Sequence, residues 1–189
     1  MQRVGARETQ RRESWRALQA AAVDLVGRRG FAAVTVDDIA AAAGVSRRTF
    51  FNHFPTKAAA LFDPDPDDAG RLADLLAGAD GAADPWRALG GVCRAYLAPH
   101  TGTLAVRRRL VEDPELAAYQ RTAYRHVERA LDGWVHRQRP DDPLAAALLA
   151  QAAAAVLGAA FTTWAPDDDP ARFLDLVARG FALVAVETP

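Results

Sequence analysis

The chain has 189 residues, of which half are apolar and a quarter are charged. This composition excludes a wholly disordered or collagen-like chain, and a single cysteine, Cys93, excludes an internal disulfide. The net charge of −1 conceals an uneven distribution, because residues 1–58 hold ten basic and five acidic residues while residues 59–189 hold 13 and 19. A basic N-terminal part is the pattern expected when that part approaches a polyanion.

The first 30 residues have the pattern of one long helix. Alanine is abundant and β-branched residues are sparse, which favours helix throughout the chain. After a loose basic arm that reaches about Arg7, apolar residues recur every three or four positions from Trp15 to Val26. This period predicts an amphipathic helix over residues 8–29, which Gly30 ends.

Three short helices follow in the prediction, and each has its own start signal. Thr35 and Asp38 have the spacing of a capping box, so a second helix begins after Thr35 and ends near Gly44. Ser46 is a natural N-cap for a third helix that runs through about residue 52, and Thr56 for a fourth that begins at residue 57. Two short helices around a glycine turn, braced by a longer helix, form a helix-turn-helix plan.

The rest of the chain predicts a further helical domain. Two prolines among four aspartates mark residues 62–68 as a hinge or loop. The aspartates there and at 167–169 are interpreted as solvated loops, with a cation site as the lesser alternative. Helices are expected at 67–78, 85–98, 103–112, 114–139, 143–165 and 169–187. The predicted fold is therefore all-α, with domains at 1–62 and 63–189.

The segment TVDDIAAAAGVSRRTFFNHFPTK, residues 35–57, closely resembles the helix-turn-helix signature of the TetR family of bacterial regulators. With the preceding helix and the RRGF of residues 28–31, the resemblance covers about residues 9–60. It implies a DNA-binding head followed by a helical body that binds an effector and forms a dimer. Phe50 and Phe54 are assigned to the core. The expected DNA-binding residues are Thr35, Ser46, Arg47, Arg48, Thr49, Phe51, Asn52, His53 and Lys57.

The resemblance implies different roles within this set. Residues 47–49 begin the recognition helix, where arginine can bridge both acceptors of guanine, and the contacts at Thr35, His53 and Lys57 fall on phosphates. Two positions depart from the family, which usually has Tyr where Phe51 stands and often Gly where Arg48 stands. Phe51 can stack but cannot donate a hydrogen bond to phosphate, and Arg48 extends base reading.

The body carries a second resemblance. The segment RRRLVEDPELAAYQRTAY, residues 107–124, is similar to actinobacterial members of the family that include mycofactocin-associated regulators, some of which sense acyl-CoA-like ligands. Large or polar residues at helical intervals are candidates for a mostly apolar effector pocket. They are Trp86, Cys93, Tyr96, Arg109, Tyr119, His126, Trp134 and Phe161.

The last two predicted helices are apolar over more than one stripe, so they need burial on two sides. We expect a four-helix interface with a second copy, and the alternative is a monomeric core. The apolar residues are Leu144, Leu148, Val156, Leu157 and Phe161 on one helix and Phe173, Leu174, Leu176, Val177, Phe181 and Val184 on the other.

Signatures of enzymes are missing from the sequence, which has no phosphate loop, metal-spaced Cys and His set or nucleophile elbow. We therefore expect a cytoplasmic repressor that binds a palindromic double-stranded operator as a homodimer and is released by a small-molecule effector. Neither a cofactor, a metal, a membrane nor catalysis is expected. An all-helical enzyme and a protein-interaction module are the alternatives.

Overall fold

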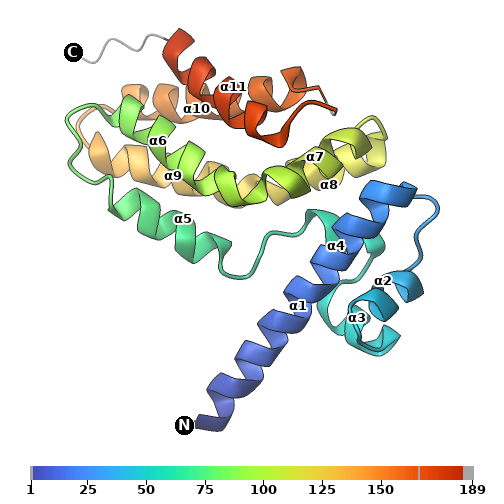
Figure 1. Cartoon of the computed structure of the whole chain (residues 1–189). Helices are drawn as coiled ribbons and strands as arrows, with labels where there is room; N and C mark the ends of the chain where they lie inside the picture. The colour runs from blue at the N-terminus through green and yellow to red at the C-terminus, as the bar shows by residue number, and fades with distance from the viewer. Residues whose placement is uncertain (1, 166, 185–189) are drawn as a thin grey trace. The chain divides into compact units, whose positions relative to one another are not determined.

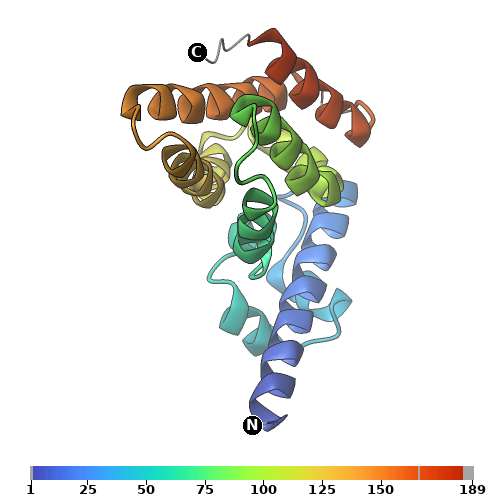
Figure 2. The ribbon, with the colours of Figure 1, turned by 90° about the vertical axis from the view of Figure 1, so that its left-hand side faces the viewer.

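The computed structural model describes residues 2–165 and 167–184, with side chains from residue 7 onward. All regular elements within these ranges are helices, which confirms the all-α prediction (Figures 1 and 2). The chain forms two compact units. The first contains residues 1–66 and 109–123, and the second contains residues 67–108 and 124–189.

The first unit, called the head unit below, contains the predicted helix-turn-helix. Its helices are α1 (Gln2–Arg29), α2 (Val36–Ala42), α3 (Arg47–His53), α4 (Lys57–Phe62) and α8 (Pro114–Ala123). The predicted N-caps are confirmed: Thr35, Ser46 and Thr56 each accept a hydrogen bond from a backbone N–H three residues later. Gly30 and Gly44 have φ of 79° and 67°, which explains why glycine ends the helices there.

The helix α1 begins at Gln2, so the prediction of a loose arm up to about Arg7 is wrong. Residues 2–7 lack an apolar period, but they contain no proline. Extending an existing helix is far easier than nucleating one. Glu8 also pairs with Arg11 and Arg12 at 3.3 Å, at spacings that stabilise a helix.

Aromatic residues are among the largest buried side chains of the head unit. Phe50 and Phe54 are fully buried, as predicted, and the ring of Trp15 on α1 lies 5.2 Å from that of Phe54. Burying each phenylalanine contributes about 1.5 to 3 kcal/mol. The α1 helix packs against α2 and α4, and α2 packs against α3, so the other helices of the head unit support α3.

The second unit, called the body unit below, contains α5 (Asp68–Ala77), α6 (Pro85–Leu97), the 3₁₀ turn η1 (Ala98–His100), most of α7 (Thr101–Leu110), α9 (Arg125–Gln138), α10 (Pro143–Thr163) and α11 (Pro170–Leu183). Here α10 packs against α9, α11 and α6, and α5 packs against α6 and α9. Residues 185–187 of the predicted last helix lie outside the described residues.

The single helix predicted over 114–139 is instead two helices, which meet at Tyr124. Each half buries its apolar residues in a different unit, because α8 packs against α4 and α9 packs against α5 and α10. The local apolar period did not reveal this change. As a consequence, residues 109–123 group with the N-terminal helices. The division into functional domains at 62/63 stays a prediction.

Candidate nucleic-acid interface and helical body

The outer face of α3 carries the residues expected to meet DNA. Arg47, Arg48, Phe51 and Asn52 are all exposed, while Phe50 on the opposite face is fully buried. This division follows from helical spacing, because positions 47, 48, 51 and 52 lie on one side of the helix. The structure therefore brings four of the predicted residues together on one open surface.

Arg47 is held by two neighbours in the free protein. Its guanidinium donates to the carboxylate of Asp37 on α2 at 2.7 Å, and it lies 5.4 Å from the centroid of the Phe51 ring. Asp37 was not among the predicted site residues, because only the fold brings α2 beside Arg47. Phe51 thus has a contact that needs no hydroxyl: its ring supports the arginine.

Three other predicted contacts also serve the head's own structure. Thr35 uses its backbone N–H and its hydroxyl to donate to Asp38, at 2.8 and 2.7 Å. The Ser46 hydroxyl accepts from the backbone N–H of Thr49 at 3.1 Å. His53 is half-buried at the end of α3, where burial and then the charge of Arg11 lower its pKa. The bonds of Thr35 and Ser46 hold these two side chains in place, and the DNA contacts of all three residues stay predictions.

Lys57 links α4 to the loop that precedes α2. Its ammonium group donates to the carbonyls of Phe31 and Val34 and lies 4.0 Å from the centroid of the Phe31 ring. Burial lowers the pKa of this lysine. The side chain therefore supports the loop in the free protein, and the phosphate contact expected from the sequence stays a prediction.

We expect Lys57→Ala to lower the free energy of unfolding by about 1 to 2 kcal/mol, because two charge-assisted bonds to backbone carbonyls are lost from a half-buried site. Urea unfolding followed by circular dichroism measures this effect. Arg48→Ala, an exposed change in the neighbouring helix, is the control and should leave stability unchanged. Equal stability of the Lys57 variant and the control would contradict the supporting role.

The eight predicted effector residues divide between the units. Arg109 and Tyr119 belong to the head unit, where the Tyr119 hydroxyl lies 3.3 Å from that of Thr56 and the ring stacks on Phe62 at 6.1 Å. The other six belong to the body unit. Of these, Trp86 and Trp134 already donate their indole N–H groups within the protein, to the Phe181 carbonyl and to Asp80.

Tyr96, Cys93, His126 and Phe161 complete the six. Tyr96 is buried, and its hydroxyl lies 2.8 Å from Nε2 of His126. Cys93 is also buried, and burial raises the pKa of its thiol to about 12, so it packs as a small neutral group. Phe161 is half-buried and its ring lies 6.3 Å from that of Phe173.

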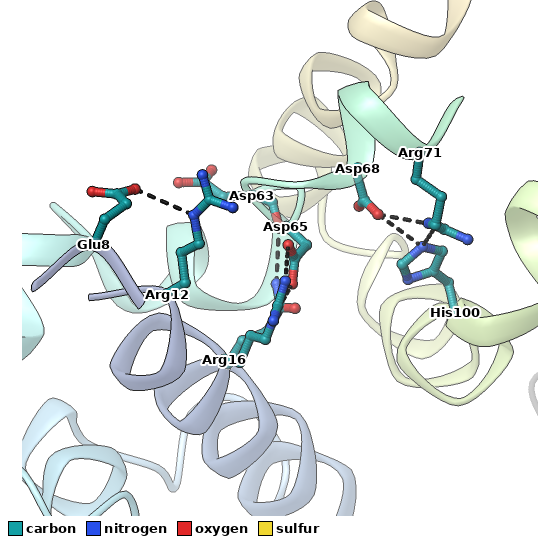
Figure 3. Close-up of polar contacts among 9 residues, drawn as sticks. Glu8, Arg12, Arg16, Asp63, Asp65, Asp68, Arg71 and His100 are labelled. Carbon is teal, nitrogen blue, oxygen red and sulfur yellow. Dashed lines mark hydrogen bonds and ion pairs between the residues drawn. The ribbon is translucent and has the colours of Figure 1, made fainter. Parts of the chain in front are cut away.

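Around Tyr96 lies a set of charged residues that sequence reasoning missed. Asp68 accepts from Arg71 at 3.0 Å, lies 3.2 Å from Nε2 of His100, and is 6% exposed (Figure 3). The Arg71 guanidinium lies 4.8 Å from the Tyr96 ring centroid, and the buried Arg107 bonds to Tyr124. We call Asp68, Arg71, Tyr96, His100, Arg107, Tyr124 and His126 the polar cluster.

The charge balance of the polar cluster explains the state of Asp68. Burial raises the pKa of this carboxyl, but hydrogen bonds and charges from His100 and Arg71 outweigh burial and lower the pKa to about 2. The interpretation of residue 68 as part of a solvated loop is therefore wrong. The spacing of Asp68 and Arg71 could have indicated an ion pair, whereas no local signal singles out Arg107 within its run of three arginines.

We expect Asp68→Asn to destabilise the protein by about 2 kcal/mol at pH 7, as the lowered pKa implies. The carboxylate's contribution is fully present above its ordinary pKa of 3.8 and disappears as the pH falls toward 2. The difference between variant and parent in urea unfolding should therefore shrink below about pH 4. Asp74→Asn, at an exposed position of the same helix, is the control. A difference that does not change with pH would contradict this account.

The helix α10 leaves an apolar face uncovered. Leu144 and Leu148 are 71% and 61% exposed, and the exposed positions continue through Gln151, Ala155 and Gly158 at intervals of three and four. By length and composition alone α10 could cross a membrane, but the core helix of a soluble protein passes the same test. Its other side packs in the core, through residues such as Val156.

This burial corrects the interface predicted from the sequence. Several of the listed residues belong to the chain's own core and are not free to contact a second copy: Val156, Phe173, Val177 and Phe181. Of the predicted residues, Leu144, Leu148 and Val184 are exposed, and so is Leu183, which the prediction did not include. Periodicity showed that both helices need cover on two sides, but it did not show which side the protomer itself covers.

Comparison with known families decides what these units are. Residues 18–63 match the family model described as bacterial regulatory proteins of the tetR family, and residues 97–189 match the MftR C-terminal domain. The chain belongs to the TetR family. The members it resembles are transcriptional regulators and not enzymes, so the helical-enzyme alternative is set aside.

A Mycobacterium tuberculosis protein named for the transcriptional regulation of mycofactocin biosynthesis, MftR, is 31% identical to this TetR-family chain over 121 residues. The match covers 62% of this chain and spans 61% of the length of that relative. Together with the match of residues 97–189 to the MftR C-terminal domain, this relative confirms the resemblance of the body to mycofactocin-associated regulators.

Solved structures share the fold. The fatty acid degradation regulator FadR of Bacillus halodurans has a TM-score of 0.64 at 20% identity, with 93% of this chain and 97% of that chain covered. Bacillus subtilis FadR, solved with stearoyl-CoA, has a TM-score of 0.63 at 19% identity, with 89% of this chain and 96% of that chain covered. Thermus thermophilus FadR, a repressor solved with lauroyl-CoA, has a TM-score of 0.56 at 23% identity, with 93% of this chain and 97% of that chain covered. At these identities the likeness establishes the fold alone.

Proposed function

We propose that this TetR-family protein represses transcription by binding a palindromic operator as a homodimer, and that a small-molecule effector in the helical body releases it. The observation that carries the proposal is the open face of α3, where Arg47, Arg48 and Asn52 project from a helix braced by a buried aromatic core. A short helix of this kind enters the major groove, where Arg reads guanine and Asn reads adenine.

The direct test is selection of bound duplexes from a random pool with purified full-length protein at physiological salt. Enrichment of an inverted repeat, with half-sites about one helical turn apart, supports a dimeric operator-binding regulator. A folded protein that enriches no sequence contradicts the proposal. Circular dichroism of the same sample establishes that it is folded.

The uncovered face of α10 supports dimerisation. Leu144 and Leu148 expose apolar surface, and Leu183 on α11 is 71% exposed. Covering this surface with a second copy would remove it from water, which is favourable. Small residues such as Gly158 on the same face permit close approach of a second helix. A two-fold axis would pair α10 and α11 with the same helices of a second copy, as four-helix interfaces do.

For the effector we propose an acyl-CoA-like molecule. Two relatives of the same fold were solved with acyl-CoAs, and the polar cluster joins cationic side chains to an apolar core. Among the predicted pocket residues, Tyr96 and His126 belong to the polar cluster, and Phe161 packs against the apolar core. Arg71 and Arg107 add positive charge suited to the anionic parts of such a ligand.

The test is release of operator DNA by lauroyl-CoA and by stearoyl-CoA, with coenzyme A and the free fatty acids as comparisons. Release by the acyl-CoAs alone supports the proposal. Equal release by the free fatty acids would make the acyl chain with its carboxylate the ligand and would contradict an acyl-CoA. Tyr96→Phe, which removes the hydroxyl next to His126, should weaken the response, because the proposed pocket includes this pair.

The effector acts in this proposal by favouring a dimer geometry that no longer matches the operator. It can shift DNA affinity only by its preference for that geometry, commonly about 1 to 3 kcal/mol. The relay we propose is the acidic, proline-containing segment 62–68 together with α4. Within the head unit α4 also packs against α8. This helix lies between two segments of the body unit in the sequence but belongs to the head unit. Cytoplasmic localisation completes the proposal.

A further inference from the structure

The side of α1 that packs against the other helices of the head unit changes from apolar to basic toward the N-terminus of α1. Trp15, Leu18, Ala22 and Val26 are buried at intervals of three and four, and the same stripe continues one turn earlier with Arg11. Arg7 stands a further turn away, and both arginines are exposed. The N-terminal end of α1 projects past α2 and α3 in both views (Figures 1 and 2).

This basic end of the stripe lies at the C-terminal end of the recognition helix. The ring of Trp15 is 5.2 Å from that of Phe54, the residue directly after α3. One turn beyond Trp15, the charge of Arg11 is close enough to His53 to affect its ionisation, after the larger effect of burial. Helix α1 therefore adds positive charge to the same side on which α3 ends.

An acidic residue lies between these cations. Glu8 binds Arg11 and Arg12 through its two carboxylate oxygens, each at 3.3 Å, and those arginines lower the pKa of Glu8. All three side chains are more than 40% exposed, so such pairs contribute little to stability and exchange readily for another anion. Figure 3 shows the Glu8 and Arg12 pair on α1.

We propose that Arg11 and Arg7 on α1 form a second DNA-binding surface on the head, next to His53 at the end of α3, and that this surface binds backbone phosphates that flank the bases read by α3. The inference rests on the proposed operator binding and extends it to a surface outside the helix-turn-helix. These contacts position the duplex without reading its sequence, because guanidinium groups bind the same phosphate at every base pair. Glu8 competes with phosphate for Arg11 and so limits the affinity.

The two substitutions Arg11→Ala and Glu8→Gln should therefore have opposite effects. Losing one phosphate contact per protomer removes two per dimer, which makes the slope of log K against log salt less steep by about 2 and lowers affinity about tenfold at physiological salt. Removing the Glu8 carboxylate should raise affinity by about threefold, because it abolishes an internal competitor and a repulsive charge next to the phosphates. Both effects should be equal on the selected operator and on a scrambled duplex.

The experiment measures affinity by fluorescence anisotropy for both duplexes over a series of salt concentrations. Arg94→Ala, at an exposed position of α6 in the body unit, removes the same charge elsewhere and should change neither affinity nor slope. Arg11→Gln, which keeps helix propensity, guards against an effect on folding. An unchanged slope in both Arg11 variants, with parental operator binding, overturns this inference alone. If the parent protein binds the selected operator no more tightly than the scrambled duplex, the proposed function is overturned instead.

Discussion

Leu148→Glu should dissociate the homodimer and lower operator affinity by at least about 30-fold. Leu148 lies on the apolar face of α10 and is 61% exposed in the single chain. In a two-fold interface each substitution appears twice, so two carboxylates would be buried against apolar surface at a cost of at least about 1 to 3 kcal/mol each. The protomer's own core does not use this side chain, so folding should be preserved.

Analytical ultracentrifugation of parent and variant over a concentration series measures the dimer affinity directly. Ala77→Glu adds the same charge at an exposed position of α5 and serves as the matched control. A Leu148→Glu protein that sediments as the parent dimer would show that the apolar face of α10 is not the interface. For either conclusion, circular dichroism must show that the variant keeps the helical content of the parent.

Arg47→Ala should weaken operator binding by about 1 to 3 kcal/mol, which is about 5- to 150-fold, and should relax base preference at one position of each half-site. The free-state partner Asp37 does not prevent this role, because the two side chains are 60% and 64% exposed and such a pair is worth at most about 1 kcal/mol. Phe51 supports the guanidinium and so limits the conformations it can adopt before binding.

Repeating the selection with the variant shows which base position has lost its preference. Arg47→Lys should resemble Arg47→Ala more than the parent, since lysine cannot form the two parallel bonds that arginine makes to guanine. Arg94→Ala in the body unit is again the charge control. Parental affinity and parental base preference in a folded Arg47→Ala dimer would exclude Arg47 from base reading.

The head could be predicted well because its signals are local. Thr35 with Asp38, Ser46 and Thr56 each satisfy backbone N–H groups within three residues, and the structure shows all three caps where they were expected. The buried positions of Phe50 and Phe54 also follow from helical spacing. The start of α1 was missed because the prediction relied on apolar spacing, whereas the helix extends through polar residues.

The candidate site in the body could be predicted only in part. Tyr96 and His126 were expected and lie in contact, but Asp68, Arg71, His100 and Arg107 joined them only in the folded unit. These residues come from α5, η1 and α7, so their spacing along the chain contains no sign of a shared environment. Their proximity is a consequence of helix packing.

By itself the sequence determined the helical class, the caps and turns of the head, and the family, since all of these depend on residues within a few positions of each other. Tertiary structure alone decided that α8 packs against α4 in the head unit and that Asp68 is buried among cations. It also decided that Leu144 and Leu148 stay exposed while Val156 is buried. The physical reason is that capping and helical period are short-range properties. Which face of an apolar helix is buried depends on neighbours that are distant in sequence.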